Sequence, residues 1–246
     1  MNDIGKPPLL KLEKLNKKFG GLVVTKDISI NVEDGQIFGI IGPNGAGKST
    51  LFNQISGYLR PDSGMITFQG KDITGLPPHR LCKRGIGRTF QIVKPFPSRT
   101  VLDNVAVGAF ARTSNRHEAL EIAEKIVHQL GLGRRIGVLA RNLTVVDRKR
   151  LELAKALATQ PKLMLLDEIL AGLTPSEVDE AIGMIRNIRD SGLTIVMIEH
   201  VMRAVMALCE HVLVINYGQR IADGTPAQVI KHPEVISAYL GEEHAA

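Results

Sequence analysis

The chain has 246 residues, enough to bury one substantial core with a smaller lobe but hardly two independent domains. A hydrophobic content of 44% and a charged content of 23% are ordinary for a globular protein in water, and no apolar run approaches the roughly 20 residues that span a bilayer. The net charge of +6 comes from short basic clusters between acidic residues, with few aromatics, so we expect a solvated surface and no nucleic-acid partner.

The N-terminal stretch and the cysteines both favour a cytosolic protein. Residues 1–14 contain no basic segment followed by an apolar core, so we expect no secretory signal. Cys82 and Cys209 lie far apart and lack C-x-x-C spacing. We interpret them as structural thiols of a reducing compartment rather than as metal ligands or a redox pair.

The first part of the chain is predicted to form strands and turns. Residues 9–15 and 27–32 alternate apolar and polar side chains, as strands with one buried face do. Residues 36–41 are almost continuously apolar, which indicates a strand buried on both faces of a sheet. A helix is predicted to open at Lys48 and to run over 48–59.

The pattern changes to helices at about residue 92. Within 116–132, one helical stripe carries the apolar residues Ala119, Ile122, Ala123, Ile126, Val127 and Leu130. Residues 148–158 continue the helical pattern.

From residue 162 onward, predicted strands and helices alternate. The strands are 162–167, 193–199 and 211–216, and the helices between them are 175–192 and 201–210. This rhythm predicts an α/β fold with a mainly parallel sheet, joined to an antiparallel β region and interrupted by helices. We expect a single domain over 1–246, in which 1–91 and 161–246 form the core lobe and 92–160 form a helical insertion.

The strongest local motif is GPNGAGKST at residues 42–50, which fits G-x-x-x-x-G-K-[ST]. Its glycines let the backbone fold tightly enough for successive N–H groups to face phosphate oxygens, and the helix N-terminus adds its positive end. We expect Lys48 to contact the β- and γ-phosphates and the Ser49 hydroxyl to ligate Mg²⁺. The alternative is a glycine-rich turn that binds no ligand, but the strand before the motif and the helix after it favour a nucleotide.

Two acidic residues follow the apolar run 163–166. Because ligands of open α/β sheets bind at the carboxyl ends of the strands, Asp167 is expected beside the phosphate loop. We predict that Asp167 holds Mg²⁺ through water and that Glu168 acts as the general base for the attacking water. An apolar strand ending in Asp-Glu is common by itself, and only the phosphate loop makes it specific.

His200 ends the next predicted strand, 193–199. A lone histidine after a strand is more often structural, but a strand beside that of Asp167 would aim this side chain toward the γ-phosphate. We therefore predict a catalytic role for His200. The other six histidines show no metal-ligand spacing.

These motifs, in this order, resemble the ATP-binding subunits of ABC transporters over essentially the whole chain. The resemblance adds Phe19 in NKKFGG, where that family stacks an aromatic ring on adenine, and Gln91 in GRTFQ, where its glutamine contacts Mg²⁺ or the attacking water. It identifies 171–174 as the D-loop. The resemblance implies Glu168, His200 and Gln91 as catalytic residues and Ser49, Gln91 and Asp167 as metal ligands. The nucleotide contacts that it implies are Phe19, Gly42, Asn44, Gly45, Ala46, Gly47, Lys48, Ser49, Thr50 and Thr144.

Three longer segments resemble the ATPases of branched-chain amino-acid importers more closely. They are 85–110, the D-loop beginning AGL, and the tail 217–241. The resemblance implies a peripheral protein on the cytoplasmic side of the inner membrane, with two permease subunits, a second ATPase subunit and a periplasmic or lipid-tethered binding protein as partners. The stiff segment 92–98 is interpreted as part of the permease contact; a turn that connects the lobes is the alternative, and one segment can serve as both.

One motif departs from the family pattern. The Leu-Ser-Gly-Gly-Gln signature, which caps the nucleotide of the partner ATPase, reads here Leu143, Thr144, Val145, Val146 and Asp147. We expect the branched valines to resist positive φ and close backbone approach, and Asp147 to repel phosphate unless Arg148, Lys149 and Arg150 offset it. Ile169 also replaces a common proline, and Thr174 a common acidic residue.

These departures leave the chain's own phosphate loop, Mg²⁺ ligands, base and histidine unchanged. They affect only the segments that would contact the nucleotide of a partner ATPase. We therefore hypothesise an asymmetric heterodimer, in which the site built on Lys48, Asp167, Glu168 and His200 hydrolyses ATP and the opposite site is slow. A homodimer is the alternative.

Other functions compete with amino-acid import. Urea importers and lipopolysaccharide exporters have related cassettes. Translation factors with two cassettes and repair ATPases with inserted coiled coils both fit a single short cassette poorly. A non-hydrolysing regulatory subunit is favoured only by the valines, and Glu168 and His200 argue against it.

Overall fold

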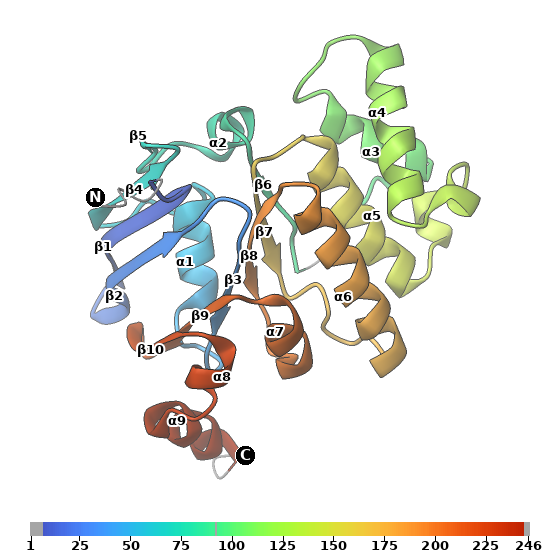
Figure 1. The fold of residues 1–246 in the computed structure, drawn as a ribbon. Coiled ribbons are helices and arrows are strands. Elements are labelled where there is room, and N and C mark those ends of the chain that lie inside the picture. The colour runs from blue at the N-terminus through green and yellow to red at the C-terminus, as the bar shows by residue number, and fades with distance from the viewer. Residues whose placement is uncertain (1–6, 92, 244–246) are drawn as a thin grey trace, which may run out of the picture.

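A six-stranded sheet forms the centre of the molecule in the computed structural model, which describes residues 7–91 and 93–243 (Figure 1). Its order is β10-β9-β3-β8-β7-β6, and the strands pair in parallel except that β10 runs antiparallel to β9. The strands are β3 (Ile37–Ile41), β6 (Ile86–Arg88), β7 (Leu163–Asp167), β8 (Thr194–Ile198), β9 (His211–Asn216) and β10 (Gln219–Gly224). The prediction of a mainly parallel sheet is confirmed.

A smaller antiparallel sheet stands beside the central one, in the order β2-β1-β4-β5. Its strands are β1 (Leu10–Phe19), β2 (Leu22–Val32), β4 (Ser63–Phe68) and β5 (Lys71–Asp72). The β1–β2 hairpin extends beyond the predicted limits of 9–15 and 27–32 because its outer residues pair in register, as Phe19 does with Leu22, although little of that end is buried.

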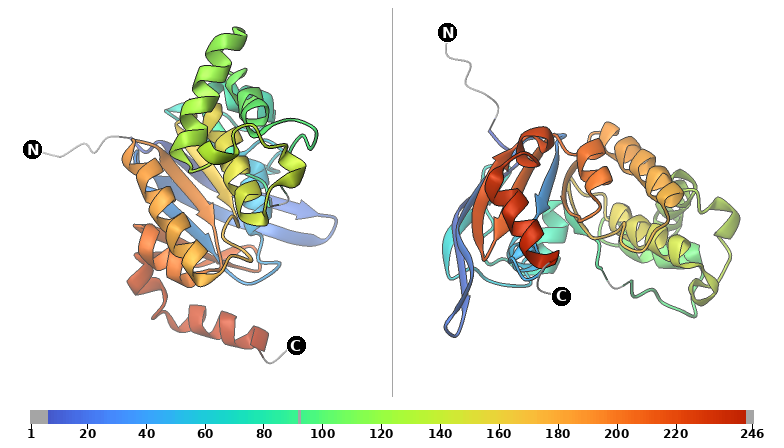
Figure 2. Two further views of the ribbon diagram at one scale, coloured as in Figure 1. Left: turned by 90° about the vertical axis from the view of Figure 1, so that its right-hand side faces the viewer. Right: turned by 90° about the horizontal axis from the view of Figure 1, so that it is seen from below.

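Helices cover both faces of the central sheet (Figure 1). They are α1 (Lys48–Ile55), α2 (Pro78–Arg84), α3 (Val101–Ala109), α4 (Arg116–Gln129), α5 (Val145–Ala158), α6 (Pro175–Asp190), α7 (Met202–Leu208), α8 (Pro226–Val229) and α9 (Pro233–Glu243), with short 3₁₀ turns at Gly133–Arg135 and Ala140–Asn142. Helix α1 lies between the two sheets, and α4 lies at the end of the molecule away from the β1–β2 hairpin (Figures 1 and 2).

The central sheet divides the interior into two cores, because alternate residues of its strands point to opposite faces. In β7, Met164 and Leu166 pack with the helices α3 to α7, whereas Leu163 and Leu165 pack with α1 and the antiparallel sheet. The continuously apolar strand predicted at 36–41 follows the same rule as β3. Burial of both faces therefore explains why these strands lack an alternating pattern.

The helical region agrees with the predicted stripe. Ala119, Ala123 and Val127 of α4 are fully buried, and Ile122 and Ile126 are partly buried against the same core. Helix α1 ends at Ile55, earlier than predicted, because Gly57 adopts a φ of +75°. Within the described residues, no helix is both long and apolar enough to cross a membrane.

Both cysteines are free thiols. Cys209 is buried behind β3, where an added Cβ on Gly39 would lie only 2.9 Å from its Sγ. Burial raises the pKa of the Cys209 thiol to about 12, and the neighbouring charges of Glu210 and Glu199 raise it further. Cys82, in α2, is only partly buried.

Two helical glycines offer a matched test of the packing of the helical region. An added Cβ on Gly108 of α3 would lie 2.3 Å from the carbonyl oxygen of Lys155 in α5, whereas Gly183 of α6 has open space around it. We expect Gly108→Ala to lower the free energy of unfolding by about 1–3 kcal/mol, because α3 and α5 must separate. Gly183→Ala should raise it by about 0.5–1 kcal/mol through helix propensity alone.

Urea unfolding of the two variants and the unmodified chain measures both effects. Equal shifts in the two variants would contradict the close approach of α3 and α5.

Candidate nucleotide and catalytic site

The register of three parallel strands brings the predicted motifs to one edge of the central sheet. Ile198 of β8 pairs with Ile40 of β3 on one side and with Asp167 of β7 on the other. The chain segments that leave these three strands therefore start side by side. They carry the phosphate loop, Glu168 and His200, so the structure confirms that the β7 and β8 strands are neighbours.

The phosphate loop is a tight turn between β3 and α1 that only glycine permits at two positions. Gly42 has a φ of +148°, and an added Cβ would lie 2.0 Å from the carbonyl oxygen of Ile215. Gly47 has a φ of +106°, and its Cβ would lie 2.3 Å from the carbonyl oxygen of Val24. The loop is therefore wedged between β9 and the β1–β2 hairpin.

Lys48 and Ser49 open helix α1 immediately after the loop. Lys48 is buried, and its Nζ donates to the carbonyl oxygens of Gly42 and Pro43 at 2.7 Å each, so the ammonium folds back over the loop. Ser49 is exposed in the first helical turn, as are Asn44 and Gly45 in the loop, while Ala46 is buried and Thr50 is half-buried. The backbone N–H groups of this first turn have no helical partners and face the loop side of the helix.

Asp167 is buried at the end of β7 and is held from two sides. The Thr89 hydroxyl accepts a hydrogen bond from the Asp167 N–H at 3.1 Å. The Arg88 guanidinium contacts the Asp167 carboxylate, with 2.8 Å between Nη2 and Oδ2. Removal of one partner from a buried ion pair costs about 3–5 kcal/mol, so this contact fixes the side chain strongly.

Glu168 lies beside the other two predicted catalytic residues, Gln91 and His200. Its Oε2 accepts a hydrogen bond from Gln91 Nε2 at 2.6 Å, and its Oε1 lies 3.5 Å from His200 Nδ1. Its backbone adopts a φ of +49°, a region that residues with a Cβ seldom occupy. This conformation is stabilised by the hydrogen bond from the Glu168 N–H to the carbonyl oxygen of Ile198, at 3.0 Å.

Phe19 lies at the end of β1, on the hairpin whose Val24 contacts the phosphate loop. Its ring is half exposed, and Lys17 Nζ lies 5.6 Å from the ring centroid. An exposed ring on an anchored hairpin beside the loop is available for stacking on a flat base.

Comparisons with known proteins cover nearly the whole chain. A family model described as ABC transporter matches residues 25–171, more than half of the chain. The chain belongs to the ABC transporter family. It is an ATP-binding, ATP-hydrolysing subunit of that family. A second model, described as branched-chain amino acid ATP-binding cassette transporter, matches residues 219–245.

Individual ABC proteins match at full length. The chain is 37% identical over 253 residues to the high-affinity branched-chain amino acid transport ATP-binding protein BraF of Pseudomonas aeruginosa, and 37% identical over 255 residues to LivG of Escherichia coli K12; each match covers 96% of this chain and 98% of the relative. The lipopolysaccharide export system ATP-binding protein LptB of Haemophilus influenzae is 35% identical, with the same coverage.

Solved ABC cassettes share the fold. The ADP conformation of one ATP-binding cassette of an ABC transporter superposes with a TM-score of 0.88 at 33% identity, over 96% of this chain and 100% of that chain. A nucleotide-free cassette gives 0.86 at 33% identity, over 94% and 98%.

The altered signature of this ABC subunit forms the start of helix α5. Val145 and Val146 are its first residues, and Thr144 is its N-cap, whose hydroxyl accepts from the Asp147 N–H at 3.1 Å. None of these residues has a positive φ. The expected conflict between valine and a left-handed backbone therefore does not arise, because the helix starts earlier than predicted from 148–158. What remains is bulk, since Val145 is 64% exposed at the helix end.

The three basic residues that follow Asp147, which were considered as a possible offset of its charge, do not pair with it. Arg148 donates to the carbonyl oxygen of Arg141, and Arg150 pairs with Glu180. Lys149 donates to the carbonyl oxygens of Ile169 and Ala171. Asp147 instead lies 3.7 Å from Arg135, on the turn before the signature. Arg148 and Lys149 lie on other faces of α5 than Asp147, and Arg150, about one turn further on, is held by Glu180 of α6.

Sequence reasoning missed two buried ionisable residues at this edge, Arg88 and Glu199. Both lie directly beside predicted residues, Arg88 at the end of β6 and Glu199 between β8 and His200. Their position at the carboxyl ends of strands was a signal that could have found them. Thr174 also has a role that was not predicted, because it caps α6 in a capping box with Glu177.

Glu199 and Lys149 hold the segment after Glu168 from opposite sides. Glu199 Oε1 accepts from the Leu170 N–H at 2.9 Å, and Lys149 donates to the carbonyl oxygens on either side of Leu170. Burial raises the pKa of Glu199 to about 7, against the lowering by the Leu170 N–H, and burial lowers the pKa of Lys149. Glu199 Oε2 is buried and has no hydrogen-bond partner among the described residues.

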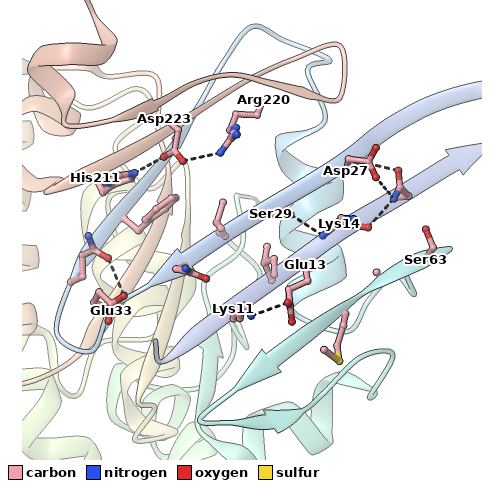
Figure 3. Close-up of a pocket in the computed structure, with 18 residues that line it drawn as sticks. Lys11, Glu13, Lys14, Asp27, Ser29, Glu33, Ser63, His211, Arg220 and Asp223 are labelled. Atoms are coloured by element: carbon pink, nitrogen blue, oxygen red, sulfur yellow. Dashed lines mark hydrogen bonds and ion pairs between the residues drawn. The ribbon is translucent and has the colours of Figure 1, made fainter. Parts of the chain in front are cut away.

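A separate groove of about 970 Å³ is lined on one side by the antiparallel sheet and on the other by His211, Arg220 and Asp223 of β9 and β10 (Figure 3). Its charged side chains pair with one another, as Lys11 does with Glu13 at 2.8 Å, and Asp223 does with His211 and with Arg220. The predicted site residues do not line it. Mutual pairing of this kind is typical of a solvated sheet face.

We predict that Glu199 makes the stability of the protein depend on pH. Its pKa is about 7 in the folded chain against 4.5 for the ordinary group, so between these values the folded state holds a proton that the unfolded state has lost. The contribution of Glu199 to the free energy of unfolding therefore falls as the pH rises from about 4.5 to 7, by on the order of 3 kcal/mol. Glu199→Gln removes this dependence.

Urea unfolding at pH 5 and at pH 8 measures the effect. Glu199→Gln should gain stability relative to the unmodified chain only at pH 8, while the exposed control Glu124→Gln should follow the unmodified chain at both values. Parallel pH profiles for the unmodified chain and Glu199→Gln would contradict the buried, protonated carboxyl.

Proposed function

We propose that this ABC subunit energises an importer of branched-chain or other hydrophobic amino acids. The observation that carries the proposal is the match of residues 219–245 to the model of branched-chain amino acid cassettes, joined to full-length similarity to BraF and LivG. The cargo does not contact this subunit, so kinship is the only guide to it.

In the proposed site, ATP binds along the edge shared by β3, β7 and β8. Lys48 leaves the carbonyls of its own loop and contacts the β- and γ-phosphates, while the backbone N–H groups of 44–50 surround them. The exposed ring of Phe19 stacks on adenine. The anchoring of the β1–β2 hairpin against Gly47 supports this placement.

The same site is suited to Mg²⁺. Ser49, Asp167 and Gln91 offer a hydroxyl, a carboxylate and an amide, which are the hard oxygen ligands that Mg²⁺ takes together with phosphates and water. Among the described residues, no three His, Cys, Asp or Glu gather to hold a metal by themselves, which fits a cation shared with a nucleotide. Bound Mg²⁺ would neutralise the charge that develops on the phosphates.

Glu168 is the proposed general base, with Gln91 and His200 as its neighbours. The hydrogen bond from Gln91 Nε2 orients one carboxylate oxygen, and the other lies toward His200, so Glu168 is presented to a water beyond the γ-phosphate. His200 is 47% exposed in its side chain and can reach the γ-phosphate directly. A base at this point accepts the proton of the water as it attacks.

We infer that the chain is one cassette, with a core lobe formed by 1–91 and 161–246 and a helical insertion formed by 92–160. A groove of about 450 Å³ lies where these parts meet and is lined by Tyr58, Phe90 and Val107, which are exposed. Exposed apolar side chains around a groove are typical of a protein contact. We propose that a permease subunit docks here.

The segment 92–98 contributes to the proposed permease contact; Ile92 itself lies outside the described residues. Phe96 is 49% exposed. Its backbone N–H donates to the buried side chain of Asn104 at 2.8 Å, and Asn104 Nδ2 donates back to the Phe96 carbonyl oxygen at 3.1 Å. This double hydrogen bond holds the turn from inside, so the Phe96 ring is presented outward.

The remaining parts of the proposal concern assembly. Two permeases, a second ATPase subunit and, indirectly, a periplasmic or lipid-tethered binding protein complete the importer, with this chain at the cytoplasmic face of the inner membrane. We propose a heterodimer rather than a homodimer, in which Thr144 caps the partner's nucleotide through the altered signature. The bulk of Val145 at the end of α5 supports a slow second site.

Lipopolysaccharide export is the second candidate function, because LptB of Haemophilus influenzae is 35% identical over nearly the whole chain. The match of residues 219–245 favours amino-acid import. Reconstitution in proteoliposomes with the permease subunits that co-purify with the chain decides between them. We expect ATP hydrolysis to rise when a leucine-loaded binding protein is added and to be unchanged by lipopolysaccharide; the reverse result would exclude the importer.

The proposed asymmetry predicts unequal effects of two matched substitutions. Glu168→Gln in this chain should lower the ATPase rate of the full complex by about 100-fold or more, because the efficient site loses its base. The equivalent change in the second ATPase should lower it by about twofold at most. Steady-state phosphate release measures both, and equal losses would rule out the asymmetric heterodimer.

A further inference from the structure

Arg88 occupies a position that connects three parts of the nucleotide site. It ends β6, and its Nη2 lies 2.8 Å from Asp167 Oδ2 at the end of β7. Its Nη1 donates to Asn53 Oδ1 at 2.7 Å and to Ser56 Oγ at 2.6 Å, at the far end of the helix that Lys48 opens. One guanidinium therefore ties α1 to the carboxylate of Asp167.

The surroundings of Arg88 leave it little freedom. Its guanidinium carbon lies 5.7 Å from the ring centroid of Phe52, 5.6 Å from that of Tyr58 and 5.3 Å from that of Phe90. Its side chain and that of Asp167 are each only 9% exposed, and its Nε is buried without a hydrogen-bond partner among the described residues. A planar group held by three rings and three oxygen acceptors has one orientation.

Stability alone is a weak explanation for this arrangement. A buried ion pair often contributes no more than an apolar pair of the same volume would, and the unpartnered Nε adds a further penalty. The cation also lies against the carboxylate that is the proposed Mg²⁺ ligand, where its charge opposes the binding of a second cation. An arginine here therefore weakens metal binding, and what it supplies in return is a fixed carboxylate.

The residues that follow Arg88 also hold the two acidic residues of the site, Asp167 and Glu168. Thr89 accepts from the Asp167 N–H, and Gln91 donates to Glu168 at 2.6 Å. Residues 88–91 thus position both acidic residues of the site from one short piece of chain. The rings of Tyr58 and Phe90, which hold Arg88, also line the groove between the core lobe and the helical insertion.

We propose that Arg88 is a positioning residue of the ATPase reaction: it fixes the Asp167 carboxylate for catalysis and, through its charge, limits the affinity of the site for Mg²⁺. The inference rests on the proposed Mg²⁺ site at Asp167. A positioning role differs from a merely structural one in its consequences. Loss of a structural residue would weaken metal binding and turnover together, whereas loss of Arg88 should strengthen metal binding and slow turnover.

The first test measures metal dependence without catalysis. Calorimetry gives the dissociation constant of a non-hydrolysable ATP analogue once with Mg²⁺ and once with EDTA. The constant in EDTA divided by the constant with Mg²⁺, here called the metal ratio, reports how much the metal strengthens binding. Arg88→Met should increase this ratio about tenfold, because the opposing charge is removed. Arg112→Met is the matched control, since Arg112 also donates to several carbonyl oxygens but lies away from Asp167, and it should leave the ratio unchanged.

The second test measures turnover in the assembled complex. Arg88→Met should lower kcat at saturating Mg·ATP by about tenfold or more, because a carboxylate free to move holds the metal in the wrong place. Arg88→Lys keeps the charge but has a single ammonium for three acceptors, so we expect a ratio within about twofold of the unmodified chain and a kcat lowered by about tenfold. If Arg88→Met shows no cooperative thermal unfolding and is therefore not folded, the kcat of Arg88→Lys tests the positioning role in its place.

The outcomes distinguish a failure of the proposed role of Arg88 from a failure of the proposed Mg²⁺ site at Asp167. An unchanged or smaller metal ratio in Arg88→Met, or an unchanged kcat in Arg88→Lys, would overturn the positioning role. Asp167→Asn should reduce the ratio sharply. If it leaves the ratio unchanged, the proposed Mg²⁺ site is wrong and the inference about Arg88 falls with it.

Discussion

The pairing of Ile198 with Ile40 and with Asp167 is the constraint on which the site depends. Backbone hydrogen bonds of a parallel sheet set the level at which each strand ends, so the phosphate loop, Glu168 and His200 would leave the sheet at one place even if their side chains made no contacts. The buried faces of β3, β7 and β8 keep that register, because a shift by one residue would exchange the two cores. The arrangement of the candidate catalytic residues in this ABC subunit is thus a consequence of strand alignment.

The parts of the molecule that were predictable from sequence are those in which a local rule and the global fold agree. GPNGAGKST requires a strand before it and a helix after it, the nearly continuous apolar run at 36–41 predicted a strand with two buried faces, and the apolar run at 163–166 predicted a buried strand. Once these strands were predicted, the rule that ligands bind at the carboxyl ends of parallel strands placed Asp167, Glu168 and His200 in one predicted site. The place of Gln91 in the site came from family resemblance, because nothing in the local pattern of GRTFQ indicates where its side chain ends, and its hydrogen bond to Glu168 is seen only in the structure.

The parts that were not predictable are contacts made between segments distant in sequence. Arg88 and Asp167 are far apart along the chain, and only the pairing of β6 with β7 brings them together. The basic neighbours of Asp147 in sequence were considered as a possible offset of its charge, whereas backbone carbonyls and Glu180 hold them and Arg135, from a preceding turn, lies beside Asp147. The valines of the signature were judged against a left-handed backbone, but Thr144 caps the helix one residue before them and places them in its first turn. In each case tertiary structure decided between local alternatives.

The different surroundings of the two thiols determine how the protein can be labelled. Cys209 is enclosed behind Gly39, and its high pKa leaves almost no thiolate at neutral pH, so maleimide reagents will react at Cys82 alone while the protein stays folded. Replacing Cys82 on the surface of α2 therefore yields a chain in which an introduced cysteine is the sole reactive position, with the core untouched. A spectroscopic probe on the β1–β2 hairpin or on the end of α5 would then report the approach of the proposed partner subunit directly.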